Sequence, residues 1–365
     1  MAALDGCARK HAVVAAVTSP APSAQLLNLP PVKVSPEREI RTICGLRPFR
    51  PSGFVVRAQK VGQKLVVHNY GHGGAGVTLS WGTGELACRE VDHAGAKSVA
   101  VLGCGAVGLA SARLLQERGY SVTIYAKELP PHTTSNVAGA QWFPFLVFHR
   151  GQQSPEFMTQ FVEASHLANA RYQVMVGPRY GIRWLPNFLM DQQPISQGGL
   201  HSFDSPIRDL LPEMHDLTAA ENPFPFPWVR QFDTMMIEPN TYLPAMMDDF
   251  HLAGGRVVVR EIRDLEELQM LPESVIVNCT GLGARALFGD NELIPVKGQL
   301  TFLLPQPEVQ YCTLGGGDLY MFPRTDGIAL GGTHEENVWT LEPDLAAKQR
   351  IVAEHARIFQ QMRRG

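Results

Sequence analysis

Residues 98–125 read Ser-Val-Ala-Val-Leu-Gly-Cys-Gly-Ala-Val-Gly-Leu-Ala-Ser-Ala-Arg-Leu-Leu-Gln-Glu-Arg-Gly-Tyr-Ser-Val-Thr-Ile-Tyr, and this stretch decides the fold. The apolar runs at 98–102 and 122–125 predict buried strands, and 109–118 predicts an amphipathic helix that Gly119 ends. Between the first strand and the helix lies G-x-G-x-x-G. Flanked in this way, the glycines predict a β-α-β dinucleotide fold with a pyrophosphate on the helix N-terminus.

The residues after the second strand could hold the rest of a dinucleotide. Lys127 stands where an acidic residue is expected, and Glu128 follows it. Either Glu128 reaches a ribose or Lys127 faces the phosphates; the alternative is two solvated loop charges. The Thr-Thr-Ser-Asn run at 133–136 offers short polar side chains to a pyrophosphate or ribitol chain. The small residues 137–140 would allow close contact with a ring system.

A second glycine-rich stretch, residues 68–82, precedes the β-α-β unit and has five glycines in fifteen residues. Glycine lets the backbone turn into left-handed conformations and approach a flat ligand closely. A helix predicted from Val77 to Arg89 would aim free N–H groups and the positive end of its dipole at an anion or a reducible ring. The alternative is an ordinary glycine-rich loop.

Further strands and helices complete a mixed fold. Apolar runs predict strands at 256–260, 274–281, 300–304, 319–322 and 328–330. The last three are predicted to belong to an antiparallel sheet. Helical patterns cover 242–252 and 344–362. The region 151–250 otherwise reads as mixed helix and loop. We therefore predict a mixed α/β (α+β) protein, with a Rossmann-like dinucleotide domain and an antiparallel-sheet substrate domain.

Composition favours a small-molecule ligand. The net charge is −3 and the pI about 6.5, which removes the electrostatic reason to expect nucleic acid or an anionic membrane surface as partner. No apolar run approaches the length of a membrane span. The six cysteines form no C-x-x-C pair, so neither a metal site nor a disulfide framework is predicted. The oligomeric state is left open.

The first 35 residues are predicted to be an extension or linker. Residues 19–36 are rich in proline, serine and leucine, a composition that disfavours regular structure. Residues 11–18 are only briefly apolar, so the segment is either a poorly ordered extension or the remnant of an export signal. The compartment therefore stays open between the cytoplasm and export with a short or lost signal.

Several of these segments together resemble the FAD-dependent D-amino-acid oxidase family. Besides the β-α-β unit they are 133–142 (Thr-Thr-Ser-Asn-Val-Ala-Gly-Ala-Gln-Trp), 277–281 (Val-Asn-Cys-Thr-Gly), 320–323 (Tyr-Met-Phe-Pro), 45–51 (Gly-Leu-Arg-Pro-Phe-Arg-Pro) and 68–74 (His-Asn-Tyr-Gly-His-Gly-Gly). The resemblance covers roughly residues 40–350. It implies FAD as cofactor, a D-amino acid as substrate and molecular oxygen as final oxidant. The implied products are a 2-oxo acid, ammonia and hydrogen peroxide.

The order of segments departs from that family. There the dinucleotide fold opens the chain, whereas here the Arg-Pro segment and the glycine loop precede it, so the chain resembles a circular permutant. The predicted division lists 1–35 as extension, 36–95 as permuted segment with the substrate arginine and flavin loop, 96–150 as FAD fold, 151–250 as substrate-side region, 251–300 as FAD-domain return, and 301–365 as substrate-domain strands with a terminal helix.

The resemblance also implies particular site residues. Arg47 and Tyr320 would bind the substrate carboxylate, and the Gly74 carbonyl would accept from the substrate amine. A planar guanidinium suits this role because it can hold a carboxylate with two hydrogen bonds. The predicted FAD-binding residues are Gly73, Gly74, Ala75, Gly76, Val77, Thr78, Gly103, Gly105, Ala106, Val107, Gly108, Lys127, Glu128, Thr133, Thr134, Ser135, Gly139, Ala140, Gln141, Ile262, Thr280 and Gly281.

Two positions depart from the family pattern. Gly316 stands where better-known members have a second tyrosine on a lid, so the site is either more open or gated by another residue. Phe143 replaces a polar side chain near the flavin. His68 and His72 are predicted to be structural hydrogen-bonders rather than bases. The rival functions are oxidation of another small amine, such as glycine, and a catalytically idle flavin-binding protein.

Overall fold

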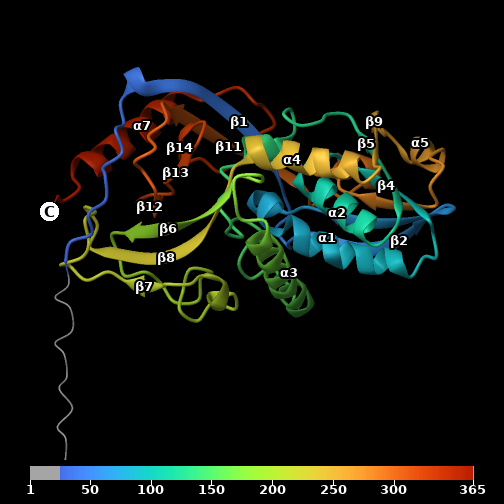
Figure 1. The fold of residues 1–365 in the computed structure, drawn as a ribbon, viewed down its shortest axis with the longest axis horizontal. Helices are drawn as coiled ribbons and strands as arrows, with labels where there is room; N and C mark the ends of the chain where they lie inside the picture. Colours follow the sequence, from blue (N-terminus) through green and yellow to red (C-terminus); the bar gives the residue numbers. More distant parts are fainter. Residues whose placement is uncertain (1–24, 365) are drawn as a thin grey trace, which may run out of the picture.

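The computed structural model describes residues 25–364, which form two β-sheets lying side by side and covered by helices (Figure 1). The large sheet has the order β1-β11-β14-β13-β12-β6-β8-β7, with β15 beside β11. Its strands are β1 (Glu39–Phe49), β6 (Ile182–Asp191), β7 (His215–Asp216), β8 (Trp228–Ile237), β11 (Ile294–Leu303), β12 (Cys312–Gly315), β13 (Tyr320–Arg324), β14 (Gly327–Gly331) and β15 (Glu335–Glu336).

The small sheet has the order β2-β3-β10-β4-β5-β9. Its strands are β2 (Val55–Val61), β3 (Lys64–Tyr70), β4 (Ser98–Leu102), β5 (Ser121–Ala126), β9 (Arg256–Val259) and β10 (Val275–Asn278). Strand β2 pairs antiparallel with β3, and every other pairing in this sheet is parallel. The helices are α1 (Gly76–Asp92), α2 (Ala106–Glu117), α3 (Pro155–Val174), α4 (Pro239–Leu252), α5 (Leu265–Gln269), α6 (Gly283–Phe288) and α7 (Leu345–Gln360).

The predicted β-α-β unit is present as β4, α2 and β5, and the predicted fold class is confirmed. The strands β4 and β5 pair in parallel from Ser98 opposite Ser121 to Leu102 opposite Tyr125. Their buried runs of valine and isoleucine suit a parallel sheet that helices cover on both faces. The small sheet is therefore the predicted dinucleotide fold.

Helix α1 is the central helix of the small-sheet half, and it is buried on most sides. A side chain at Gly82 would overlap the Ala164 carbonyl, so this glycine lets the backbones of α1 and α3 approach closely. The Trp81 indole N–H donates to the Tyr242 hydroxyl of α4 over 2.8 Å. The helix that follows the predicted glycine loop is thus fixed by α3 and α4.

The prediction for residues 151–250 missed two long strands. Strands β6 and β8 have ten residues each and pair antiparallel from Ile182 opposite Ile237 to Asp191 opposite Trp228. Pro186 obscured β6, because proline inside a run argues against a strand. The large sheet is also not wholly antiparallel, since β12 pairs in parallel with β6.

Part of the predicted N-terminal linker packs on the large-sheet half. Residues 1–24 lie outside the described residues, but Val32 is buried beside α7. The Tyr311 hydroxyl donates to the Pro30 carbonyl over 2.9 Å. The Gln306 side chain exchanges two hydrogen bonds, of 2.8 and 3.0 Å, with the backbone of Lys33. These contacts hold the segment against the end of the sheet.

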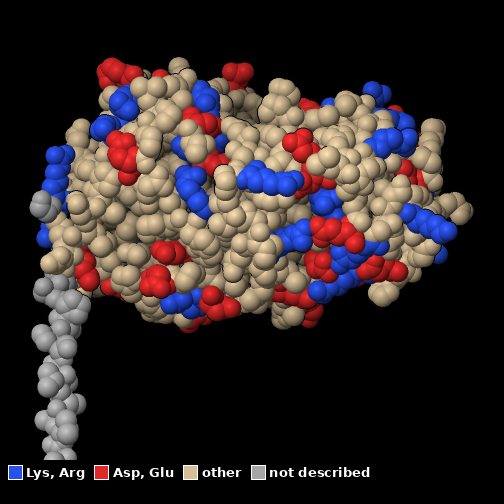
Figure 2. All heavy atoms as spheres, viewed as in Figure 1, with Lys and Arg blue, Asp and Glu red and all other residues tan. Residues whose placement is uncertain are grey.

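The surface carries mixed charge. Lys and Arg are interspersed with Asp and Glu over the face shown in Figure 2. Within the described residues, no helix combines the length and hydropathy needed to cross a bilayer.

Candidate active site

A cavity of about 1310 Å³ is lined by residues from both sheets. Ordinary ligand pockets measure about 300–1,000 Å³, so this cavity has room for a dinucleotide and a small second ligand. Every predicted cofactor or substrate residue lines it except Ala75. The Ala75 methyl group is fully buried in a cluster with Leu79 and Phe161, so a contact of Ala75 with the cofactor stays a prediction for its backbone.

The glycines of the G-x-G-x-x-G motif have different roles in the part of the cavity where the phosphates of a dinucleotide would bind. Gly103 has φ +100°, and a Cβ there would lie 2.5 Å from the Cys279 carbonyl oxygen, while one at Gly108 would overlap the Gly103 carbonyl. These two glycines allow close packing of β4, β10 and α2. Gly105 is the residue before α2, and the free N–H groups of that helix provide an anion site.

Ser135 joins the polar run at 133–136 to the start of α2. The Ala106 N–H donates to its hydroxyl over 3.0 Å, and a Cβ at Gly105 would lie 3.0 Å from the same oxygen. The Thr133 hydroxyl donates to the Asn136 side chain over 2.8 Å. The polar run therefore lies where the phosphates of a dinucleotide would be.

At the opposite end of the dinucleotide region, Lys127 is paired rather than free. Its Nζ lies 3.7 Å from Glu261, and both side chains are exposed. Glu128 and Ile262 line the same part of the cavity. Such an exposed pair is weak, so both Lys127 and Glu128 remain candidates to contact a dinucleotide at this place.

The small residues after the polar run form one wall of the cavity, and β8 and β13 hold it in place. Ala140 has a left-handed φ of 64°, and its carbonyl accepts from the Ile237 N–H over 2.9 Å. The Ala138 carbonyl accepts from Arg324, whose side chain is almost fully buried, over 2.8 Å. We call residues 138–141 the ring wall.

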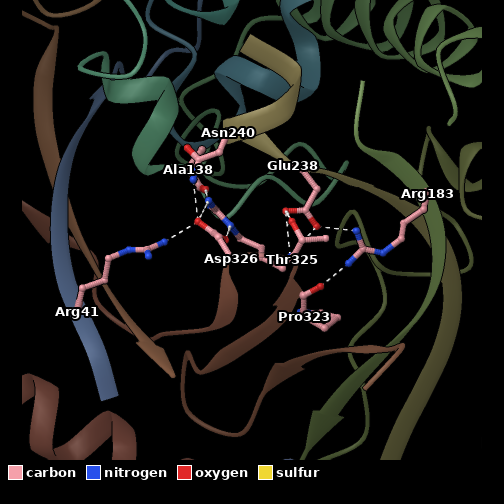
Figure 3. Close-up of polar contacts among 9 residues, drawn as sticks. Arg41, Ala138, Arg183, Glu238, Asn240, Pro323, Thr325 and Asp326 are labelled. Carbon is pink, nitrogen blue, oxygen red and sulfur yellow. Dashed lines mark hydrogen bonds and ion pairs between the residues drawn. The ribbon is translucent and has the colours of Figure 1, made fainter. Parts of the chain in front are cut away.

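Arg324 belongs to a polar network that joins the ring wall to several elements (Figure 3). Its guanidinium makes two 2.9 Å bonds to Asp326. Asp326 also accepts from Arg41 of β1 over 2.5 Å and from Asn240 of α4 over 2.7 Å. Because Arg324 lies on β13, the network ties the large sheet to Ala138 of the ring wall and to α4.

Glu238 makes a second set of bonds beside this network, and Figure 3 shows it between Arg183 and Thr325. Its carboxylate lies 2.5 Å from Arg183 and accepts from the Thr325 N–H over 3.1 Å. Glu238 follows β8 directly and is buried. These bonds fix the junction of β8 and α4. The last residue of β8, Ile237, donates its N–H to Ala140 of the ring wall.

The glycine loop after β3 forms another part of the cavity wall. A side chain at Gly73 would overlap the Leu146 carbonyl, and one at Gly74 would lie 2.7 Å from the Phe145 carbonyl oxygen. The Thr78 hydroxyl donates to the Phe143 carbonyl over 3.1 Å, so it holds the chain that follows the ring wall. Gly76 begins α1 and lines the cavity, and a Cβ built there would be in van der Waals contact with His72 and Val107, each 3.9 Å away.

Arg47 and Tyr320 meet at one side of the cavity, as predicted. Arg47 Nη2 donates to the Tyr320 hydroxyl over 3.2 Å, and Nη1 donates to the Thr333 carbonyl over 3.3 Å. Among residues 25–364, no carboxylate forms an ion pair with Arg47. An unpaired guanidinium in a cavity wall is a site for a ligand carboxylate.

Two glycines that the sequence analysis did not single out give this pair its position. A Cβ at Gly298 of β11 would overlap the Arg47 guanidinium, and one at Gly331 of β14 would overlap the Tyr320 ring. Both side chains therefore lie flat on the sheet. Strand pairing gives a partial signal, because Tyr320 is opposite Gly331 in the register.

Arg50, in the same Arg-Pro segment, has a different role. It lies 2.8 Å from Asp290 and 2.5 Å from Glu292, and it also donates to the Gly53 carbonyl over 2.8 Å. Its charge is therefore compensated inside the protein, in contrast to that of Arg47.

His68 and His72 are both bonded to the protein. His68 bonds through Nε2 to Gln59 and through Nδ1 to Asn278, each over 3.1 Å. His72 Nε2 bonds to Thr83 over 2.9 Å. Burial lowers the pKa of His72 to about 3 and, together with the charge of Arg57, that of His68 to about 4. Both are suited to structure rather than to proton transfer near neutral pH.

Four aromatic residues line the cavity in two pairs. Phe143 stacks on His201 with ring centroids 3.8 Å apart. His334 lines the cavity next to Arg47, and its ring lies 5.1 Å from that of Phe145. Burial and the charge of Arg47 lower the pKa of His334 to about 4, so this side of the cavity presents a neutral imidazole. The sequence carried no signal for His201 or His334.

Comparisons with known proteins agree with this geometry. A sequence profile of the family described as FAD dependent oxidoreductase matches residues 23–90 and 98–364. D-amino-acid oxidase of Streptomyces coelicolor is 32% identical over 269 residues, covering 72% of this chain and 78% of the relative. D-aspartate oxidase of Homo sapiens is 29% identical over 263 residues, covering 70% and 74%. The crystal structure of glycine oxidase from Bacillus cereus ATCC 14579 shares the fold, with TM-score 0.54, 15% identity and 72% and 78% coverage.

The fold and the cavity define an oxidoreductase built around a dinucleotide cofactor. The chain belongs to the FAD-dependent oxidoreductase family, with FAD as its cofactor. The predicted resemblance is thereby confirmed, and the family match is wider than the residues 40–350 expected from the motifs.

Gly331→Ala tests whether Tyr320 needs a glycine beneath its ring in order to bind a carboxylate together with Arg47. We expect its affinity for propionate, measured by calorimetry on the flavin-loaded protein, to fall about tenfold or more, because a hydrogen bond to a charged group is worth ~1.5–3 kcal/mol. Gly199→Ala is the matched control, since no atom lies within 4 Å of its built Cβ. An unchanged affinity for propionate in Gly331→Ala would mean that Tyr320 does not need the space that this glycine leaves.

The buried histidines predict a loss of stability in mild acid. Burial lowers the pKa of His68 and His355 to about 4 and that of His72 to about 3, from an ordinary value of 6.5. The unfolded chain therefore takes up protons first, and stability present above pH 6.5 falls as the pH drops toward 4, by up to ~1.4 kcal/mol per pH unit for each histidine. Urea unfolding at pH 7, 6 and 5 measures this slope. His355→Gln should reduce it, and equal stability at all three pH values would contradict the argument.

Proposed function

We propose that this enzyme catalyses the FAD-dependent oxidative deamination of D-amino acids. The products would be a 2-oxo acid, ammonia and hydrogen peroxide, with molecular oxygen as final electron acceptor. The observation that carries the proposal is the Arg47–Tyr320 pair, a carboxylate site in the wall of the FAD cavity. The relatives named D-amino-acid oxidase support it.

The residues on the cavity wall would hold the two ends of an amino acid. Arg47 and the Tyr320 hydroxyl bind its carboxylate, and the Gly74 carbonyl on the glycine loop accepts from its amine. These two points, together with the cofactor face, fix which hydrogen of the α-carbon faces the ring. When bound, FAD supplies the two-electron oxidising power that no side chain has.

The cofactor would be held by the residues already described. The N-terminus of α2 and the 133–136 run meet the phosphates, and Glu128 meets the ribose. The ring wall, the glycine loop and the first residues of α1 all line the cavity and would contact the flat ring of the cofactor. The dipole of α1 would favour a ligand that carries negative charge near the N-terminus of this helix.

The chemistry depends on orientation more than on a side-chain base. His68 and His72 are occupied in hydrogen bonds with Gln59, Asn278 and Thr83. The neutral state of His334 avoids placing a second cation beside Arg47. The substrate carboxylate would therefore meet the charge of Arg47 without competition from a second cation at His334.

Anaerobic mixing with amino acids tests the proposal. The purified protein should be yellow, and D-amino acids but not their L-enantiomers should bleach the visible flavin band. Arg47→Ala should keep its colour and lose at least about 100-fold in bleaching rate, because it removes a bidentate charged contact worth ~3 kcal/mol. A colourless protein or a yellow one bleached by no amino acid would contradict the proposal, and bleaching by glycine alone would favour a glycine oxidase.

Arg50→Ala is the matched control for Arg47→Ala. It removes an arginine three positions away, whose charge is already paired with Asp290 and Glu292. We expect it to lower the thermal midpoint while the folded fraction still responds to D-amino acids. If both variants lost bleaching and stability together, Arg47 would be a structural residue.

We also propose that the segment order arose by circular permutation. The family profile matches in two pieces on either side of residues 91–97. Arg363 donates to the carbonyls of Pro223 and Asn222, and Leu27 donates to that of Glu221, so the ends of the described chain lie on one loop. The division at residues 35, 95, 150, 250 and 300 is part of this proposal.

A chain with the family order tests the permutation. It would run from residue 98 to 364, continue through a short Gly-Ser linker, and end with residues 25–92. Because every described pairing is retained, we expect it to fold, bind FAD and keep the unfolding midpoint within a few degrees. Failure of the soluble rearranged chain to bind FAD would contradict the proposal, and a rearranged chain of equal length cut inside α2 is the control expected to fail.

A further inference from the structure

The turn between β12 and β13 is seated on neighbouring elements instead of projecting over the cavity. Gly315 and Gly316 have φ of +92° and +69°. The Gly316 N–H donates to the Met190 carbonyl at the end of β6 over 3.0 Å, and a side chain at Gly315 would overlap that same carbonyl. The turn is therefore held against β6 by its backbone.

Phe226 fills the space that a side chain at position 316 would need. A Cβ at Gly316 would lie 2.8 Å from Cζ of Phe226 and 3.6 Å from Ile358 of α7. Phe226 is 5% exposed and lines the cavity. Its carbonyl accepts from the Asn222 side chain over 2.7 Å, which anchors its backbone. A fixed aromatic ring thus stands where the family pattern has a tyrosine on a lid.

An apolar strip connects this ring to the carboxylate site. Leu314 pairs with Tyr320 on one side and with Leu189 on the other, and all three residues line the cavity. Residues paired directly in neighbouring strands face the same side of the sheet, about 4.8 Å apart per strand. The strip leads from Tyr320 across β12 to β6, and Phe226 stands beside its end at Gly316.

We propose that Phe226 is a specificity-determining residue, which closes the end of this strip and limits the length of substrate side chain that the cavity admits. The inference rests on the proposed function, because it takes the substrate to be an amino acid held at Arg47 and Tyr320. No lid movement is needed, since the wall is part of the packed core of the large-sheet half.

Phe226→Ala and Phe224→Ala form a matched pair of variants. Phe224 lies in the same segment and the same buried cluster and is 3% exposed, but it packs on Phe188, 5.2 Å away, and does not line the cavity. The measured quantity is the ratio of kcat/KM for D-tryptophan to that for D-alanine. We expect Phe226→Ala to raise this ratio at least tenfold, because each methylene of pocket space is worth about tenfold or more in discrimination. Phe224→Ala should leave it within about twofold of wild type.

The ratio would overturn the proposal if it were unchanged in Phe226→Ala or rose equally in Phe224→Ala. Should Phe226→Ala fail to fold, Phe226→Leu keeps an apolar side chain, and a rise of at least about threefold is then expected. An unchanged ratio in Phe226→Leu overturns the proposal as well.

A binding experiment separates this inference from the proposed function. If wild type oxidised no D-amino acid, the proposed reaction would fail, but calorimetry could still compare octanoate with propionate on the yellow protein. The ratio of octanoate affinity to propionate affinity should then be at least fivefold higher in Phe226→Ala than in wild type. No such change would overturn the role of Phe226 independently of the reaction.

Discussion

The pairing of β10 with β3 on one side and β4 on the other is the constraint on which the site depends. Asn278 is opposite His68 in one register and opposite Leu102 in the other. The three strands are parallel, so their carboxyl ends meet at one edge. The glycine loop, the G-x-G-x-x-G turn and Thr280 all begin there. A slip of one residue in either register would exchange the side chains that β10 presents to the two buried faces of the sheet.

The two halves of the site are joined by buried polar contacts rather than by apolar packing alone. Arg324 holds the ring wall from the same strand that carries Tyr320, so the proposed carboxylate site and the proposed cofactor wall share one rigid support. Charged hydrogen bonds fix distance and direction, which apolar contacts do not. Catalysis by orientation benefits from such a support, because a small displacement of either wall misaligns the α-carbon.

Local signals made part of this structure predictable. The β-α-β unit and the glycine loop follow from glycine spacing beside apolar runs, and Arg47 and Tyr320 follow from short motifs. Gly298 and Gly331 were not predictable, because their role is to leave space beneath side chains that are distant in sequence. Strand β6 was missed because Pro186 masked it. The burial of Ala75 away from the cavity was not predictable, because a glycine-rich stretch does not show which way its one methyl group points.

The pairing of β3 with β10 also sets the order of events during synthesis. Asn278 and His68 are 210 residues apart, whereas β4 and β5 are neighbours in the chain. Contacts between distant segments form late, because long loops must close first. The hairpin of β2 and β3 is therefore made with the free edge of β3 unpaired. This edge stays unpaired until β10 has been synthesised. Such an edge is a template for association between chains until β10 has been made.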